Sequence, residues 1–149
     1  MAKVLDRLQH VAGDLKKLRE QYTAPGLLGA EVSRAKVRDL SSKEIVRLRQ
    51  QLLLSQQQLA QWLNVSLVSI SRWERDRGRP SAREARTLAR LAELVAAVGS
   101  RLTPKEMTRF FGEPHEDLYN DRPVDVLATE IGYRIVRHML ERLLNAEYA

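Results

Sequence analysis

Hydroxyl, amide and guanidinium side chains crowd one short stretch of the sequence, from Ser55 to Arg79. They fall on two helical patterns separated by the residues 64–66, a connection too short for anything but a sharp corner. Ser66 can cap the second helix, which then presents its first turn outward. Such groups can hydrogen-bond base edges and neutralise phosphates, so this stretch favours nucleic-acid binding over catalysis.

The second helix of this pair would lie in the major groove, with the residues near its N-terminus against the bases. The positions expected to face the bases are Leu67, Val68, Ser71 and Arg72. The positions expected to hold the DNA backbone, or to open the helices that do so, are Gln56, Ser66, Ser69, Arg75, Arg77 and Arg79. An ordinary helical hairpin with solvated arginines is the alternative, which the turn length, caps, core pattern and basic flank together disfavour.

Charge is spread unevenly along this chain of 149 residues, whose net charge is +6. Residues 41–95 hold ten basic and five acidic side chains, whereas residues 96–149 hold seven basic and nine acidic ones. A basic middle followed by an acidic end indicates two partners of different kinds, and the partner of the middle segment is expected to be a polyanion.

Signs of catalysis or of a cofactor are missing from the sequence. The chain has no cysteine, and His10, His115 and His138 are far apart in sequence, so we expect neither a metal nor another cofactor. No phosphate-binding loop or nucleophile motif occurs, so we expect no enzyme and no small-molecule substrate. No apolar run reaches the length of a membrane span, which predicts a cytoplasmic protein without a membrane partner.

The pattern is helical throughout and predicts an all-α fold. The S/T-x-x-E/Q spacing, in which cap and third residue exchange hydrogen bonds, marks four helix starts. These starts are Ser41, Ser55, Ser81 and Thr103. A further helix is expected from about Thr129 to Asn145. We expect three segments: residues 1–40, a helix and linker; residues 41–98, the DNA-binding domain; and residues 99–149, a small helical domain that follows a break at Gly99.

The first segment contains a short seam of apolar residues at helical spacing. The seam consists of Val4, Leu8, Val11, Leu15, Leu18 and Tyr22. It fits a dimerising arm and an amphipathic helix packed on its own domain equally well.

A resemblance to the Xre/Cro-repressor family of helix-turn-helix domains is carried by Ser55-Gln56, Leu59-Ala60, Val65-Ser66, Ile70-Ser71-Arg72-Trp73-Glu74 and Pro80-Ser81. It covers residues 42–97 and implies a five-helix DNA-binding domain with Glu74 as a structural acid. A homodimer is expected as well, because one small recognition helix covers only half of a two-fold operator. Asp76-Arg77-Gly78 stands where that family commonly has a single glycine turn. Apolar Leu67 and Val68 replace amides, which shifts the expected readout toward thymine methyl groups.

The last third of the chain carries Phe110-Phe111, Pro114, Leu118, Pro123-Val124-Asp125-Val126-Leu127, Thr129 and Gly132 in order. These residues resemble the toxin-binding domain of the Xre/MbcA/ParS antitoxins. The resemblance implies a RES-domain toxin that acts on NAD, whose cleft the C-terminal end would block. The expected toxin contacts are Ile135, Met139, Arg142, Leu143, Tyr148 and Ala149.

The terminal helix has an apolar stripe broad enough to cover its own domain and a partner, although packing within the domain alone is the simpler interpretation. The sequence is therefore compatible with three functions. The leading one is an antitoxin that neutralises a toxin and represses its own operon. The others are a stand-alone repressor whose C-terminal domain dimerises or senses, and a protein-interaction module that no longer binds DNA.

Overall fold

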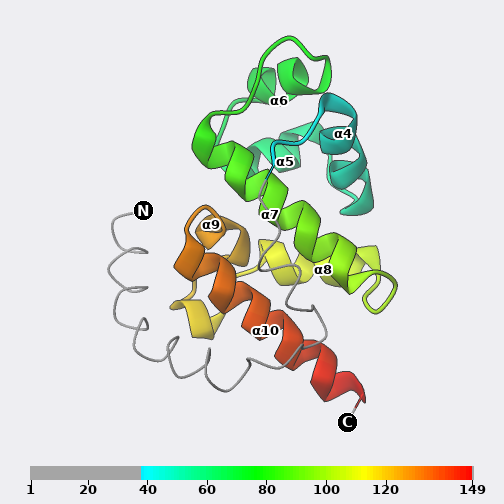
Figure 1. Ribbon diagram of the computed structural model, residues 1–149, viewed down its shortest axis with the longest axis vertical. Coiled ribbons are helices and arrows are strands. Elements are labelled where there is room, and N and C mark those ends of the chain that lie inside the picture. Colours follow the sequence, from blue (N-terminus) through cyan, green and yellow to red (C-terminus); the bar gives the residue numbers. More distant parts are fainter. Residues whose placement is uncertain (1–37, 149) are drawn as a thin grey trace.

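The computed structural model describes residues 38–148, with backbone alone for the last two. Within that range all regular structure is helical, apart from one bridged pair, His115 and Asp121. In chain order the elements are α4 (Ser42–Gln51), α5 (Gln56–Leu63), α6 (Leu67–Glu74), α7 (Ala82–Val98), α8 (Pro104–Gly112), the 3-10 helix η1 (Glu116–Leu118), α9 (Pro123–Val126) and α10 (Glu130–Tyr148) (Figure 1). The all-α prediction is confirmed, whereas the predicted N-terminal helix lies outside the described residues.

Four helices begin at the serine or threonine that the sequence predicted, and three of these starts carry the reciprocal hydrogen bonds. At Ser41, Ser55 and Thr103 the hydroxyl accepts from the third helical amide, and the side chain at that third position accepts from the cap amide. Ser81 also begins a helix, but its side chain makes no capping hydrogen bond, so the prediction is wrong in that detail. Its expected partner Glu84 instead lines a cleft and has one buried carboxylate oxygen.

Residues 41–98 form four α-helices, α4 to α7, rather than the five that the resemblance implied. The stretch from Ala82 to Val98 contains neither glycine nor proline, so nothing interrupts its backbone hydrogen bonds, and it forms the single 17-residue helix α7. This helix ends at Gly99, whose φ of +60° favours glycine. Across residues 38–148 we find no helix with the length and apolar character needed to cross a membrane.

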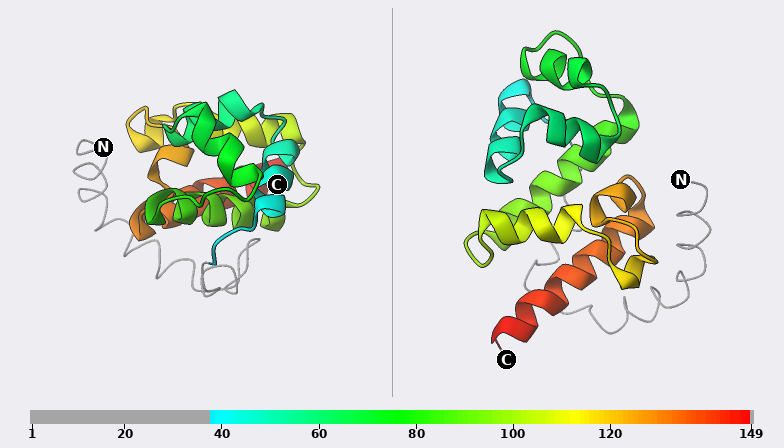
Figure 2. Two further views of the ribbon diagram at one scale, coloured as in Figure 1. Left: turned by 90° about the horizontal axis from the view of Figure 1, so that it is seen from above. Right: turned by 180° about the vertical axis from the view of Figure 1, so that it is seen from behind.

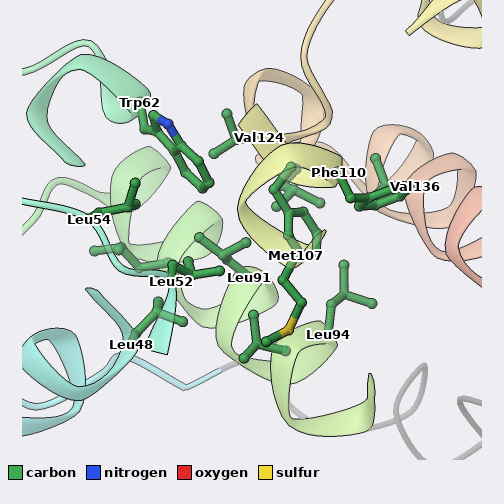
Figure 3. Packing of buried hydrophobic residues seen from close by; sticks show 14 of the residues in the cluster. Leu48, Leu52, Leu54, Trp62, Leu91, Leu94, Met107, Phe110, Val124 and Val136 are labelled. Carbon is green, nitrogen blue, oxygen red and sulfur yellow. The ribbon is translucent and has the colours of Figure 1, made fainter. Parts of the chain in front are cut away.

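Helix α7 supplies one core to both halves of the chain. Leu91 lies beside Leu52 from the end of α4, and Leu94 lies beside Met107 of α8 (Figure 3). All four side chains belong to the same buried cluster, which also contains residues of α9 and α10. The chain turns at Gly99, as expected, but the core does not divide there, so the boundary at 98/99 stays a prediction.

Trp62 of α5 forms one of the contacts with the C-terminal half. Gly112 lies so close to its ring that a Cβ atom there would come within 2.6 Å of Trp62 Cζ2. Arg122 pairs with Asp125 through contacts of 2.9 and 2.7 Å and also donates to the backbone carbonyl of Trp62 over 3.2 Å. These contacts fix α8 and the start of α9 against α5.

Candidate nucleic-acid interface and partner interface

The turn between α5 and α6 has the geometry that its sequence predicted. Asn64 adopts the left-handed conformation, with φ 56° and ψ 45°, which asparagine tolerates better than most residues. Ser66 accepts a hydrogen bond from the amide of Ser69 and thereby begins α6. Helix α6 is eight residues long and ends at Glu74.

Helix α6 has one buried face and one exposed face. Ile70 and Trp73 belong to the core, with 0% and 7% of their surface exposed. The opposite side holds the four positions predicted to face bases: Leu67, Val68, Ser71 and Arg72. Of these only Ser71 is half-buried, and the other three are exposed. A ligand that approaches α6 from solvent would therefore meet these four side chains first.

Glu74 holds α6 against the two preceding helices. Its carboxylate accepts from Nε and Nη2 of Arg49 over 2.7 and 2.9 Å, and from Nε2 of Gln56 over 3.1 Å. Arg49 also donates to the carbonyl of Leu54 over 3.0 Å. The hydrogen bonds with Glu74 raise the pKa of Arg49 and so favour its charged form. Glu74 thus has the structural role that the resemblance implied.

The loop after Glu74 turns on Asp76, whose φ is +56°. Gly78 does not adopt a left-handed conformation, although it is the residue that could do so without strain. Its place is taken by an aspartate, which tolerates this conformation better than most residues. The predicted backbone-gripping residues of this loop, Arg75, Arg77 and Arg79, are all exposed.

Three other predicted DNA contacts are already engaged within the protein. The amide of Gln56 donates to Glu74, as described above. The hydroxyls of Ser66 and Ser69 lie 3.0 Å apart and hydrogen-bond each other. Gln56 and Ser69 are half-buried and Ser66 is exposed, so they border the exposed face of α6 rather than project from it.

The apolar stripe of α10 packs mostly inward. Val136, Leu140 and Leu144 are fully buried, which supports packing within the chain as the main role of the stripe. Of the predicted toxin contacts, Met139 is 7% exposed and Ile135 is half-buried. The exposed ones are Arg142 and Leu143. The side chain of Tyr148 and all of Ala149 lie outside the described residues.

The start of α10 depends on a threonine and a glycine. Thr129 Oγ1 accepts from the amide of Gly132 over 3.0 Å, which caps the helix. A Cβ atom at Gly132 would stand 1.9 Å from the carbonyl oxygen of Val126 in α9. The Thr-x-x-Gly pattern therefore serves the close approach of α9 to α10.

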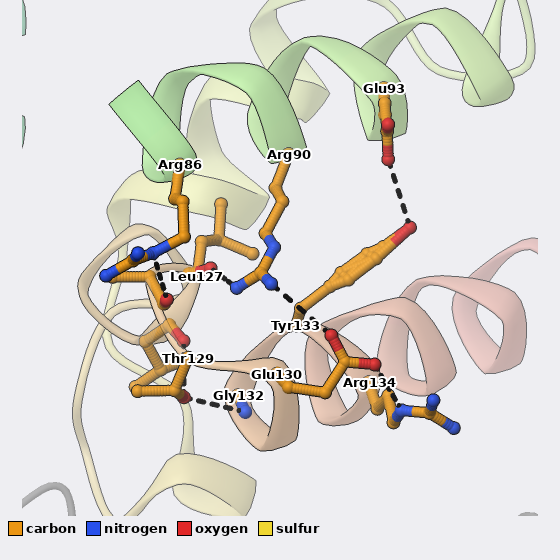
Figure 4. A network of polar contacts seen from close by, with 11 residues as sticks. Arg86, Arg90, Glu93, Leu127, Thr129, Glu130, Gly132, Tyr133 and Arg134 are labelled. Atoms are coloured by element: carbon orange, nitrogen blue, oxygen red, sulfur yellow. Dashed lines mark hydrogen bonds and ion pairs between the residues drawn. The ribbon is translucent and has the colours of Figure 1, made fainter. Parts of the chain in front are cut away.

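Arg90 of α7 contacts the same junction between α9 and α10 (Figure 4). Its Nη1 donates to the carbonyl of Leu127 over 2.7 Å, and its Nη2 lies 3.3 Å from Oε2 of Glu130. Its guanidinium also lies 5.4 Å from the ring centre of Tyr133. Tyr133 donates to Glu93 of α7 over 3.4 Å, and burial raises the pKa of Tyr133 to about 12.

Comparison with known families agrees with this two-part arrangement. Residues 45–93 match a helix-turn-helix family, and residues 93–145 match the family described as the antitoxin Xre/MbcA/ParS C-terminal toxin-binding domain. The chain is an antitoxin. It binds DNA through the first domain and a toxin through the second, and neither domain belongs to an enzyme family. No curated protein and no solved structure matches the antitoxin significantly.

Both family resemblances are thereby confirmed, but the sequence did not reveal how the two domains of the antitoxin are joined. Arg86 and Arg90 belong to the basic middle segment of the sequence, but in the structure they donate to the carbonyls of Ala128 and Leu127. Arg86, Arg90 and Glu93 are spaced four and three residues apart, so they share one side of α7. This row of polar side chains on one side of the helix was the sequence signal that α7 contacts a second part of the chain.

Proposed function

We propose that the antitoxin neutralises a RES-domain toxin that consumes NAD, and that it represses its own operon by binding a two-fold operator as a homodimer. The exposed face of α6 carries the DNA part of this proposal. Its side chains point away from a fully packed core and continue into exposed arginines. The helix that would enter the groove is therefore held in place before any DNA is present.

Arg72 provides the most direct test of base readout. Arg72→Ala removes an exposed side chain and no core packing, so it should weaken binding to the operator by about 1–3 kcal/mol while toxin binding is unchanged. A gel-shift titration measures this, and Arg109→Ala, at an exposed arginine on α8, is the matched control. Equal operator affinity in the two variants would remove Arg72 from the readout.

Arg77 and Arg79 are expected to neutralise phosphates rather than read bases. Replacing both with glutamate should weaken all duplexes similarly and reduce the slope of log affinity against log salt concentration. Arg72→Ala should leave that slope nearly unchanged. A retained slope after the double charge reversal would mean that these side chains do not contact DNA.

The homodimer follows from the size of the recognition helix, because one such helix covers only a half-site. Footprinting should show two protected half-sites about one helical turn apart. Sedimentation of the complex should give two antitoxin chains per duplex. A single protected half-site bound by one chain would contradict the proposal.

The C-terminal end of α10 is the proposed toxin contact, because Arg142 and Leu143 are exposed there while the rest of the stripe is largely packed. Leu143→Asp should cost about 2 kcal/mol or more of toxin affinity if this leucine is central to the interface. Leu53→Asp, at an exposed leucine outside α10, is the control. Circular dichroism establishes that both variants fold.

The identity of the toxin is tested separately. The gene adjacent to the antitoxin gene should encode a RES-domain protein, and this protein should consume NAD in vitro. Addition of the antitoxin should stop that consumption, and a truncation that lacks residues 141–149 should not stop it while still binding operator DNA. Full inhibition by the folded truncation would move the toxin contact elsewhere.

A further inference from the structure

The exposed face of α6 begins with two large apolar side chains. Leu67 and Val68 are neighbours in the first helical turn and are 47% and 64% exposed. Adjacent exposed apolar side chains add nothing to the core, and such patches commonly mark a contact with a ligand. They lie in the first turn of α6, and the first turn of a recognition helix is the part that reaches the base edges in the major groove.

The polar groups of the same turn are already paired. Ser66 Oγ accepts from the amide of Ser69, and the two hydroxyls lie within hydrogen-bonding distance of each other. The first turn therefore offers a base pair mainly apolar surface. Hydrogen-bonding readout by α6 is left to Ser71 and Arg72, one turn further along.

We propose, on the basis of the function proposed above, that Leu67 and Val68 determine operator specificity by contacting the C5 methyl groups of thymines at neighbouring base pairs. The bases display donors, acceptors and a single kind of methyl group, that of thymine, in the major groove. An apolar side chain gains from burying that methyl. Against a G·C pair the same side chain would cover donors and acceptors without satisfying them.

The position of Arg72 adds a constraint on the half-site. It lies five residues after Leu67, which is about 7.5 Å along the helix axis. This distance corresponds to about two base-pair steps. Because arginine pairs best with guanine, each half-site should carry its contacted thymines and a guanine within about two base pairs of each other.

The charge around the apolar pair points to DNA rather than to a protein. Arg72 shares their face of α6, and the exposed Arg75, Arg77 and Arg79 follow it directly. Residues 41–95 have twice as many basic as acidic side chains. A polyanion fits this setting better than an apolar protein surface does.

Removal of single methyl groups from DNA tests the proposal. The full-length chain would first select duplexes from a random library, and the enriched duplex would be resynthesised with uracil in place of each thymine in turn. Uracil differs from thymine only by the methyl group. Affinity should fall about fourfold at each contacted thymine and stay constant at the others.

Variants of the two side chains assign each methyl group. Val68→Thr keeps the shape but replaces a methyl with a hydroxyl, and Leu67→Ala shortens the side chain. In each variant the uracil effect should disappear at one position and persist at the other, as in a double-mutant cycle. Leu53→Asn, at a leucine that is 65% exposed in the loop after α4, should retain the full uracil sensitivity.

The outcomes separate this inference from the proposed function. If Arg72→Ala weakens binding but no uracil substitution does, methyl readout is overturned and the DNA-binding role stands. If no duplex is enriched, both fall. If the Leu67 and Val68 variants lose dimerisation or toxin binding instead of DNA affinity, the apolar pair is a protein contact and the inference is overturned.

Discussion

Gly112 and Gly132 of the antitoxin are required by their neighbours rather than by backbone conformation, since neither has a positive φ. The neighbour of Gly112 is the ring of Trp62, and the neighbour of Gly132 is the carbonyl oxygen of Val126. A side-chain ring can shift slightly within a packed core. A backbone carbonyl moves only with the chain around it, so Gly132 is the less replaceable of the two.

Gly132→Ala should accordingly destabilise the C-terminal half. The added Cβ atom would meet Val126 at 1.9 Å, so α9 and α10 must separate, at a cost of about 3 kcal/mol or more. Thermal melts followed by circular dichroism measure the effect. Gly78→Ala is the control, because its Cβ atom would find its nearest neighbour at 3.8 Å. Equal melting temperatures for the two variants would contradict the close approach at Gly132.

Glu141 is a buried acid on α10, with 7% of its surface exposed. Burial raises its pKa above the ordinary range, and Arg137 offsets part of that rise. The folded state therefore binds this proton more tightly than the unfolded chain does, so the charged carboxylate costs stability at neutral pH.

Glu141→Gln should then raise the melting temperature at neutral pH. The gain should shrink as the pH falls through the folded pKa and should be gone below the unfolded value of about 4.3. Melts of parent and variant across this range provide the measurement. A gain of the same size in acid and at neutral pH would mean that the effect has another origin.

Among the elements, α6 owes its position to an ion pair between helices. Glu74 at its end and Arg49 of α4 have side chains that are 6% and 18% exposed, so solvent screens their attraction only weakly. The same carboxylate also accepts from Gln56 at the start of α5. One acid thus sets the angle of the recognition helix relative to both helices before it.

Glu74→Ala should cost about 3 kcal/mol of folding free energy, because it leaves Arg49 partly buried without its partner. Operator affinity should fall as well, although Glu74 faces the protein interior. Glu113→Ala breaks an exposed pair with Arg109 and should cost less than about 1 kcal/mol. Denaturant titrations of both variants, beside a gel shift, test this. If the Glu74 variant were as stable as the Glu113 variant, the ion pair between Glu74 and Arg49 would not be what holds α6 in place.

Elements that depend on neighbours in sequence could be predicted, and those that depend on distant contacts could not. The capping residues Ser41, Ser55 and Thr103 satisfy helix amides three residues away, so their pattern is visible in the sequence. Ser81 has the same pattern but makes no capping hydrogen bond, and Glu84 lines a cleft instead. The exposed face of α6 followed from helical periodicity, whereas the burial of the α10 stripe depends on helices that sequence alone does not bring together.

At the scale of the whole molecule, α6 and the C-terminal end of α10 lie at opposite ends of the described chain (Figures 1 and 2). The two proposed surfaces therefore leave room for DNA and toxin at the same time. Between them the core is continuous, and Trp62 of α5 packs directly on Gly112 of α8.

Gly112→Ala, although it lies in the C-terminal half, should therefore perturb the packing of the DNA-binding half. The Cβ atom would press on Trp62, which should alter the fluorescence of that tryptophan and lower stability by about 1–3 kcal/mol. Combining it with Trp62→Phe, which provides a smaller ring, should recover part of the loss. Strictly additive effects in this double-mutant cycle would mean that the two positions do not communicate.

Because α7 packs against both halves of the antitoxin, it limits how the DNA-binding half of this chain can be joined to the C-terminal segment of another antitoxin. A chimera that joined residues 1–98 of this chain to the C-terminal segment of another would bring foreign neighbours to Trp62, Arg86 and Arg90. The incoming segment would have to present a glycine to the tryptophan and two backbone carbonyls to the arginines. Toxin choice and operator choice are therefore expected to be inherited as one unit, and an engineer who wishes to reassort them must transplant the facing residues of α5 and α7 together with the C-terminal segment.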